Sequence, residues 1–288
     1  MFKAFELRIK NGEFDNITNQ DKKLQIRLWH SIGFQKKIEF NTEYSELLKN
    51  YLKDGTIDGT ELAKEVFAQN SYDVFLSYSH DDEDLVFIIA GLLSDQFGLN
   101  VFVDTFYWGS ADGLLKEIDD INCKNADGTY DYAKRNLSTS HVHAMLTSAI
   151  IQIMDSSEAV IFVNTDNSVP ILKDTLSGTK EYTFSPWIYE EILLTNYLRE
   201  RNWSEYRKIQ LNEKFDYSKK ELNITYELPT ENLIPLNWTN ILEWMQINHE
   251  LNIVDKKRIS TIEELTLHFT YELKHPLNIL HKMIEKNA

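Results

Sequence analysis

The sequence has a single cysteine, Cys123, and few residues that interrupt regular structure: five prolines and ten glycines among 288 residues. One cysteine cannot form an internal disulfide, which excludes a small disulfide-stapled fold and favours a reducing compartment. The low proline and glycine content argues against a collagen-like or disordered chain. Hydrophobic residues make up 42% of the chain and aromatic residues 12%, which is enough to bury a sizeable core.

Long apolar runs are missing too. The longest apolar stretches, residues 85–93 and 144–154, fall short of the about 20 residues that a bilayer requires. The amino-terminal segment MFKAFELRIKNGEF is charged throughout and lacks the apolar core of a secretory signal. We therefore expect a soluble, cytoplasmic protein.

Positive charge is scarce, because 30 Lys and Arg residues stand against 45 Asp and Glu residues, for a formal net charge of −15 at pH 7. A surface of this sign repels nucleic-acid phosphates and anionic lipid headgroups. We expect neither a nucleic acid nor a membrane among the partners.

From residue 72 onward, apolar strand-like runs alternate with helical patterns. The runs at 74–76, 101–104 and 159–163 are typical of parallel strands buried on both faces. Helices are predicted at 82–97, with Gly98 as the stop, at 141–154, and from Ser185-Pro186 onward. This order predicts an α/β fold with right-handed βαβ units, a parallel sheet and helices on both of its faces.

The pattern divides the chain into two parts. Residues 1–70 are predicted to be an N-terminal, mainly helical extension, with helices at 41–55 and 60–67 and a short strand at 5–9. Residues 71–288 are predicted to form the α/β domain, with a long insertion at about 105–140 and an elaborated C-terminal part. Expected elements of that part are a strand at 224–228 and helices at 238–247 and 260–273. The insertion is rich in Asn, Asp, Gly and Ser, which favours a loop with one short helix.

Polar residues follow the predicted strands at the edge where open parallel sheets bind ligands. The first strand leads into Ser77, Tyr78, Ser79 and His80, the second into Asp104 and Trp108, and the third into Asn164 and Thr165. The helix that begins at Pro186, with Ser185 as its N-cap, should direct its first turns toward the same edge. Trp187 and Glu191 are four residues apart and share one helical face. An aromatic ring and an exposed carboxylate are thus expected to reach one cleft.

Four segments together carry a family resemblance: YDVFLSYSHDDE, NVFVDTFYWGSADG, SSEAVIFVNT and SPWIYEEI. In this order they resemble the Toll/interleukin-1 receptor (TIR) domain over residues 71–200, and in particular the bacterial TIR proteins that consume NAD+. The second segment is similar to the strand and BB loop of that family. Ser185, Trp187 and Glu191 match its S-x-W-x-x-x-E pattern. The resemblance implies the flavodoxin-like TIR fold.

The resemblance implies an NAD+ glycohydrolase or ADP-ribosyl cyclase, with Glu191 as the catalytic residue, NAD+ as the substrate, and no cofactor or metal. The chemistry of the residues agrees with this reading. Cleavage of the nicotinamide–ribose bond places positive charge on the ribose, and a nearby carboxylate stabilises that charge. Nicotinamide leaves without a proton, so one carboxylate suffices. The expected substrate-binding residues are Ser77, Tyr78, Ser79, His80, Asp104, Trp108, Ser185 and Trp187.

The resemblance also implies partners. By similarity to the TIR components of Thoeris-type anti-phage defence, we expect TIR–TIR self-association and a separate effector protein that senses the product. Two other functions fit the same pattern: a non-enzymatic TIR scaffold, and an enzyme like the nucleoside deoxyribosyltransferases. The second of these gives no role to FYWGSADG.

Simpler readings exist for single residues. Glu191 could merely complement the helix dipole, and Trp187 could be a core aromatic residue. For Asp104, a capping role after its strand is favoured over ligand contact, and Glu190 is expected to be solvated. His141 and His143 are two residues apart and cannot share a helical face, which argues against a metal site.

Overall fold

The computed structural model describes residues 3–9, 23–35, 72–170, 181–198, 226–227, 230, 232–258 and 275–287. These residues contain a wholly parallel sheet in the strand order β3-β2-β4-β1-β7. Its strands are β1 (Lys3–Arg8), β2 (Val74–Ser77), β3 (Val101–Val103), β4 (Ala159–Asn164) and β7 (Ile234–Asn237). Every residue of β2, β3 and β4 is buried, as expected of parallel strands covered on both faces. The α/β fold is therefore confirmed.

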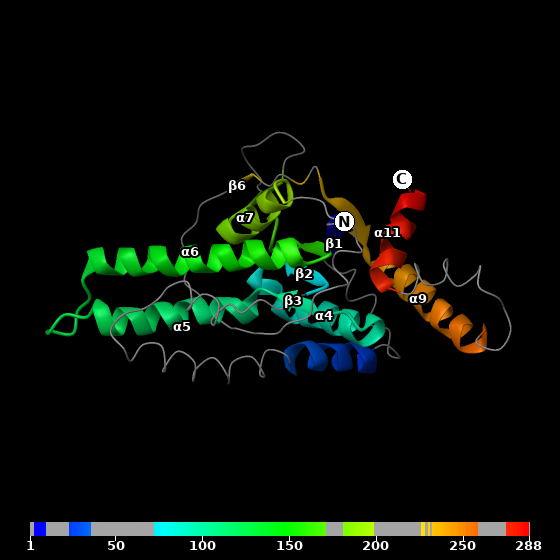
Figure 1. Cartoon of the computed structure of the whole chain (residues 1–288), viewed down its shortest axis with the longest axis horizontal. Helices are drawn as coiled ribbons and strands as arrows, with labels where there is room; N and C mark the ends of the chain where they lie inside the picture. The colour runs from blue at the N-terminus through cyan, green and yellow to red at the C-terminus, as the bar shows by residue number, and fades with distance from the viewer. Residues whose placement is uncertain are drawn as a thin grey trace.

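Helices cover the two faces according to the direction in which the chain crosses the sheet. The helix at residues 23–35 connects β1 to β2, and α4 (Glu83–Phe97) connects β2 to β3. Both connections cross the sheet in the direction of β3. The connections through α6 (Tyr132–Ser156) and α7 (Pro186–Thr195) run the opposite way. Because such crossovers are right-handed, the two groups of helices lie on opposite faces, as Figure 1 shows. Ligand sites of such sheets lie where the crossing direction reverses, here at the ends of β2 and β4.

The amino-terminal strand lies inside the sheet. Phe5 of β1 is aligned with Ile161 of β4 on one side and with Ile234 of β7 on the other. In the doubly wound order 2-1-3-4-5, β2, β3 and β4 occupy the places of the first three strands. The fourth place, beside β4, is filled by β1 from the start of the chain. Residues 3–8 therefore belong to the sheet, and a boundary at residue 70 does not separate them from it.

The helix at 23–35 packs tightly on α4 through two glycines. A Cβ atom on Gly91 would lie 1.8 Å from the Trp29 carbonyl oxygen, and one on Gly33 would lie 2.3 Å from the Phe87 carbonyl oxygen. Only glycine permits backbones to approach this closely. The Trp29 indole N–H also donates to Asp95, at 3.0 Å. This N-terminal helix is thus part of the α/β core.

The C-terminal part adds α9 (Trp238–Arg258), which packs beside α4, and α11 (Pro276–Asn287), which packs against α9. The Trp244 ring stacks on Phe97 of α4 at 4.0 Å between centroids. The predicted strand at 224–228 is represented by β6 (Tyr226–Glu227), which pairs with β5 (Tyr182–Thr183). The helices predicted at 41–55, 60–67 and 260–273 lie outside the described residues. None of the helices in the described ranges combines the length and apolar character needed to cross a membrane.

The prediction of a loop with a short helix at 105–140 is wrong. This region belongs to two long helices, α5 (Thr105–Asn122) and α6, which run side by side as a hairpin that projects from the sheet (Figure 1). The buried residues Ala111, Leu114 and Ile118 recur at helical spacing on α5. Some of the Asn, Asp and Gly residues that suggested a loop form the turn at 123–131, and the others lie within the two helices. FYWGSADG, matched to the BB loop, lies within α5.

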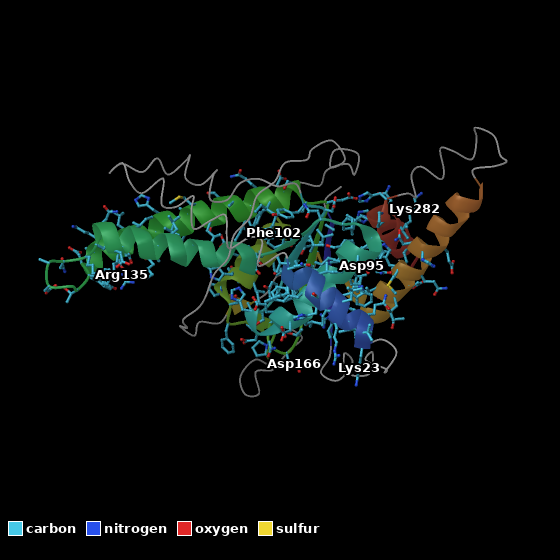
Figure 2. All side chains as sticks on the ribbon, turned by 90° about the horizontal axis from the view of Figure 1, so that it is seen from below. Lys23, Asp95, Phe102, Arg135, Asp166 and Lys282 are labelled. Atoms are coloured by element: carbon cyan, nitrogen blue, oxygen red, sulfur yellow. The ribbon has the colours of Figure 1, made fainter. Side chains whose placement is uncertain are left out.

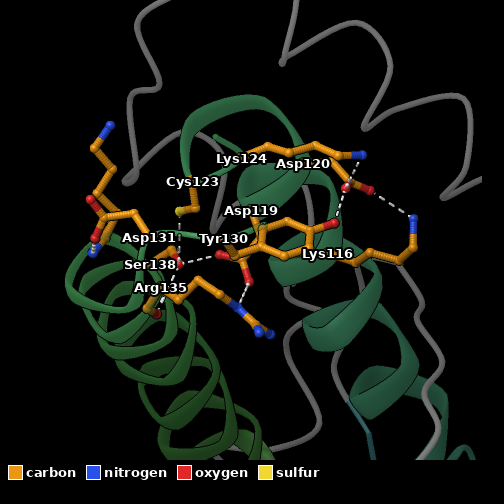
Figure 3. Close-up of polar contacts among 10 residues, drawn as sticks. Lys116, Asp119, Asp120, Cys123, Lys124, Tyr130, Asp131, Arg135 and Ser138 are labelled. Atoms are coloured by element: carbon orange, nitrogen blue, oxygen red, sulfur yellow. Dashed lines mark hydrogen bonds and ion pairs between the residues drawn. The ribbon is translucent and has the colours of Figure 1, made fainter. Parts of the chain in front are cut away.

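A polar network joins the two helices at the tip of the hairpin (Figure 3). The buried Asp119 carboxylate accepts hydrogen bonds from Arg135 Nε at 2.8 Å and from Ser138 Oγ at 2.5 Å. On the exposed side, Asp120 accepts from Tyr130 and from Lys116. Hydrogen bonds from these two groups lower the pKa of Asp120 to about 2. Arg135 lies far along the hairpin from Phe102 of the sheet (Figure 2).

Cys123 lies at the same end of the hairpin and is buried. Its Sγ is 3.9 Å from Ser138 Oγ, and burial raises the pKa of its thiol. A buried thiol held in the neutral form is a poor nucleophile. Cys123 therefore acts as a packing residue of the hairpin.

Candidate functional site

Three elements bring polar side chains together at the carboxyl edge of the sheet. Ser77 is the last residue of β2, Asp104 follows β3, and Glu191 lies on α7, which packs against β2. Their exposed fractions are 0%, 2% and 1%, so all three are withdrawn from solvent. The carboxylates of Asp104 and Glu191 are close enough to interact electrostatically.

The position of Glu191 follows from how α7 begins. The Ile188 N–H donates to the Ser185 hydroxyl at 3.3 Å, and Pro186 occupies the first helical position. The predicted helix start is confirmed, and it gives Ser185 a capping role. Ile188, Glu191 and Ile192 form the buried face of the helix. Glu191 therefore points toward the sheet by the same spacing that buries its apolar neighbours.

The environment of Glu191 opposes ionisation. Burial raises the pKa of its carboxyl group well above the ordinary value, and the negative charges of Asp104 and Glu190 act in the same direction. The nearby Ser77 hydroxyl acts in the opposite direction. Among the described residues, neither Glu191 oxygen has a hydrogen-bond partner of good geometry. An exposed cleft carboxylate was expected, and that expectation is wrong.

Asp104 does not cap the helix that follows it. Its side chain makes no capping hydrogen bond to α5, so the capping interpretation is wrong. Asp104 Oδ2 instead lies 3.6 Å from His80 Nε2, while Oδ1 has no hydrogen-bond partner within the described ranges. His80 is partly exposed. The structure thus connects two of the predicted binding residues and places one of them next to Glu191.

Tyr78 and Ser79 support this arrangement from the loop after β2. The Tyr78 ring is buried and lies 6.0 Å from the His80 ring, between centroids. The Ser79 carbonyl accepts a hydrogen bond from the Asp82 N–H at 2.8 Å, which starts the short helix η2 (His80–Asp82). Tyr78 therefore packs beneath His80, and Ser79 fixes the course of the loop.

Trp187 lies one turn before Glu191 but in a different environment. Its half-buried ring meets the His143 ring edge-on, at 5.4 Å between centroids and 80° between planes. Partial burial lowers the pKa of His143. His143 is a neighbour that the sequence did not identify, since it was considered only as a metal ligand. The backbone of Trp108 lies in the first turn of α5.

Glu190 is not solvated as expected. Burial raises the pKa of its carboxyl group, and a hydrogen bond from Thr147 of α6 partly offsets that effect. Glu190 thus connects α7 to α6, on the side of the helix next to the Trp187–His143 contact.

A second polar cluster lies farther along the same edge. Arg8 Nη2 is 3.0 Å from both Glu6 Oε2 and Glu181 Oε1. Asn164 Nδ2 donates to Glu6 Oε1, which joins the ends of β1 and β4. No motif in the local sequence predicts this cluster. The one indication is a charged residue, Glu6, between the alternating apolar residues of the first strand.

The chemistry available at the first cluster is that of two buried carboxyl groups with different environments. Asp104 has His80 as a neighbour, while Glu191 lies near the Ser77 hydroxyl and the negative charges of Asp104 and Glu190. Pairs of titratable groups whose environments differ in this way are common in acid–base and cation-stabilising sites. Across the described residues no group of three or more His, Cys, Asp or Glu side chains could hold a metal ion.

Comparison of the chain with protein-family models, with curated proteins and with solved structures gives no match. The site must therefore be interpreted from its own geometry.

Proposed function

We propose that the chain cleaves the nicotinamide–ribose bond of NAD+, with Glu191 as the catalytic carboxylate. The observation that carries this proposal is the buried Glu191 carboxyl group next to Asp104, at the carboxyl edge of a parallel sheet, with no hydrogen-bond partner among the described residues. Buried carboxyl groups without hydrogen bonds destabilise a protein, so a sequence that retains one retains it for a reason other than folding. The resemblance to NAD+-consuming TIR domains supports the same residue.

The proposed reaction needs negative charge where the ribose becomes positive. When the bond between C1′ and the pyridinium nitrogen breaks, its electron pair leaves with nicotinamide, which becomes neutral. The positive charge passes to the ribose as an oxocarbenium ion. The ionised Glu191 carboxylate stabilises that ion most strongly in a site withdrawn from water. Water then gives ADP-ribose, and an adenine nitrogen gives a cyclic product.

Burial of Glu191 has a consequence for turnover. With 1% of Glu191 exposed, a ribose reaches the carboxyl group only when covering side chains move aside. We therefore expect low turnover in dilute solution. The resemblance to TIR proteins implies that turnover per molecule increases as the protein associates with itself. The product would act as a signal for a separate effector protein in cytoplasmic anti-phage defence.

The test is release of nicotinamide from NAD+ by the purified chain, over a series of protein concentrations, with mass spectrometry of the nucleotide product. Glu191→Gln should reduce turnover a hundredfold or more, because it removes the charge that stabilises the transition state. Glu243→Gln on α9, an exposed residue, serves as the matched control and should leave turnover unchanged.

Three results would contradict the proposal. Full turnover by Glu191→Gln would move the chemistry to another residue. Absence of nicotinamide release at every concentration would favour a TIR scaffold. Exchange of nucleobases between nucleosides, in preference to NAD+ cleavage, would favour a deoxyribosyltransferase-like enzyme.

A further inference from the structure

Four buried polar atoms at the site lack a hydrogen-bond partner in the described part of the chain: Ser77 Oγ, Asp104 Oδ1, and both carboxyl oxygens of Glu191. Three of these belong to carboxyl groups. Buried acceptors in native structures are normally satisfied, and each exception requires an explanation. Here the exceptions are adjacent, so one bound group could satisfy them together.

The charges around these atoms indicate what that group is. Asp104 and Glu190 both act on Glu191 with negative charge, and no positive side chain of the described residues acts on it. His80 faces only one oxygen of Asp104, at 3.6 Å. Arg8, at the same sheet edge, is already paired with Glu6 and Glu181. What the site lacks is positive charge.

We propose that Asp104 and Glu191 together form a subsite for a cationic group of the ligand, and that Asp104 is the residue that makes the site select positive charge. The inference rests on the proposed function, in which that group is the pyridinium ring of the oxidised dinucleotide. The reduced dinucleotide carries a neutral dihydropyridine ring and should be rejected. Asp104 acts on the charge of the ligand and on the protonation of Glu191, and is a specificity-determining residue.

Binding of a cation at this subsite should change the number of protons bound to the protein. In the free protein, burial and the neighbouring Asp104 keep the Glu191 carboxyl protonated above its ordinary pKa. A cation that enters the subsite favours the ionised form, so Glu191 releases its proton to solvent. One positive charge enters and one leaves. A neutral ligand of the same shape displaces no proton.

The first test uses the wild-type chain and two small probes, 1-methylnicotinamide, which is a cation, and nicotinamide, its neutral counterpart. Calorimetry at several pH values above the ordinary pKa of a glutamate carboxyl group, each in two buffers of different ionisation enthalpy, reports the protons released. We expect the cation to bind at least tenfold more tightly and to release protons, and the neutral probe to release none. Equal binding of the two probes, binding of neither, or binding of the cation without proton release overturns the proposal.

The second test measures the Glu191 carboxyl directly by carbon-13 NMR titration of the ligand-free protein. Asp104→Asn should lower the proton affinity of Glu191 tenfold or more, because a like charge is removed. It should also reduce the preference for the cationic probe. Asp84→Asn, at a side chain that is 92% exposed, is the matched control and should change neither. An unchanged Glu191 titration in a folded Asp104→Asn protein refutes the role of Asp104.

The two proposals fail differently. Proton-coupled binding of the cation without NAD+ cleavage would leave the subsite standing and remove the enzymatic function. Cleavage of NAD+ with no difference between the two probes would do the reverse.

Discussion

Glu191 is a residue whose environment in the folded protein reduces stability. Its carboxyl group is buried, lacks a hydrogen bond from the described residues, and faces a second carboxylate. In an unfolded chain the same group is solvated and ionised at neutral pH. Folding must therefore protonate it or bury its charge, and either route reduces the free energy of unfolding. Sites that do chemistry commonly carry such a burden.

The loss of unfolding free energy caused by Glu191 depends on pH in a definite direction. A carboxyl group whose pKa is raised by folding does not reduce the unfolding free energy at a pH below its pKa in the unfolded chain. Above that pH it reduces the unfolding free energy increasingly, by at most about 1.4 kcal/mol per pH unit. Glu191→Gln removes this titration. We expect the unfolding free energy of the variant, relative to wild type, to rise as the pH increases above the ordinary pKa of a glutamate carboxyl group. Urea unfolding at several pH values measures it.

Glu243→Gln is the control for this series, because it replaces a glutamate at an exposed position and should have little effect on the unfolding free energy. If the unfolding free energy of Glu191→Gln, relative to wild type, did not rise with pH, burial would not perturb Glu191.

At the residue scale, sequence patterns predicted which residues make up the candidate site, but not how those residues are buried or which side chains they contact. The cap at Ser185 and the position of Glu191 on α7 follow from local rules, and the edge rule for parallel sheets places Ser77 and Asp104 with them. The burial of Glu191 and the contact between Asp104 and His80 depend on side chains from separate elements. No spacing within one segment encodes such contacts.

At the scale of elements, the α5–α6 hairpin is the main departure from expectation. The prediction treats the whole of 105–140 as a turn-rich segment, whereas the Asn, Asp and Gly residues of 123–131 form one turn between two helices. The Asp131 carboxylate starts α6 by accepting from the Lys134 N–H at 3.0 Å. Helical spacing of apolar residues on α5 was the better guide, because tertiary packing of that face stabilises the helix.

The hairpin provides a matched pair of neighbouring carboxylates. Asp119→Ala removes a buried acceptor and leaves Ser138 and the partly exposed Arg135 without it, so we expect the unfolding free energy to fall by about 1–3 kcal/mol. Amide hydrogen exchange should accelerate at the tip of the hairpin before the sheet is affected. Asp120→Ala removes an exposed ion pair and should have a clearly smaller effect. Equal effects of the two variants would contradict the assigned role of Asp119.

At the scale of the whole molecule, the sheet is completed by strands from distant parts of the sequence. β1 pairs with β4 across more than half of the chain, and with β7 farther still. Local periodicity suggests a strand at 5–9 but carries no information on its partners, and neighbouring segments usually pair with one another. The place of the helix at 23–35 likewise follows from contacts between distant residues, since Gly33 lies against Phe87 of α4, and Gly91 of α4 lies against Trp29. Topology was therefore the least predictable level.

An interior position for β1 makes its apolar residues as important as those of β2. Leu7 is fully buried between β4 and β7, so Leu7→Ala should reduce the unfolding free energy by about 2–5 kcal/mol through lost burial and the cavity that remains. Leu24 on the helix at 23–35 is 83% exposed, and Leu24→Ala should change the unfolding free energy by less than about 0.5 kcal/mol. Urea unfolding of both variants makes the comparison. If the two substitutions had similar small effects, residues 3–8 would be an appendage, and the sheet would end at β4.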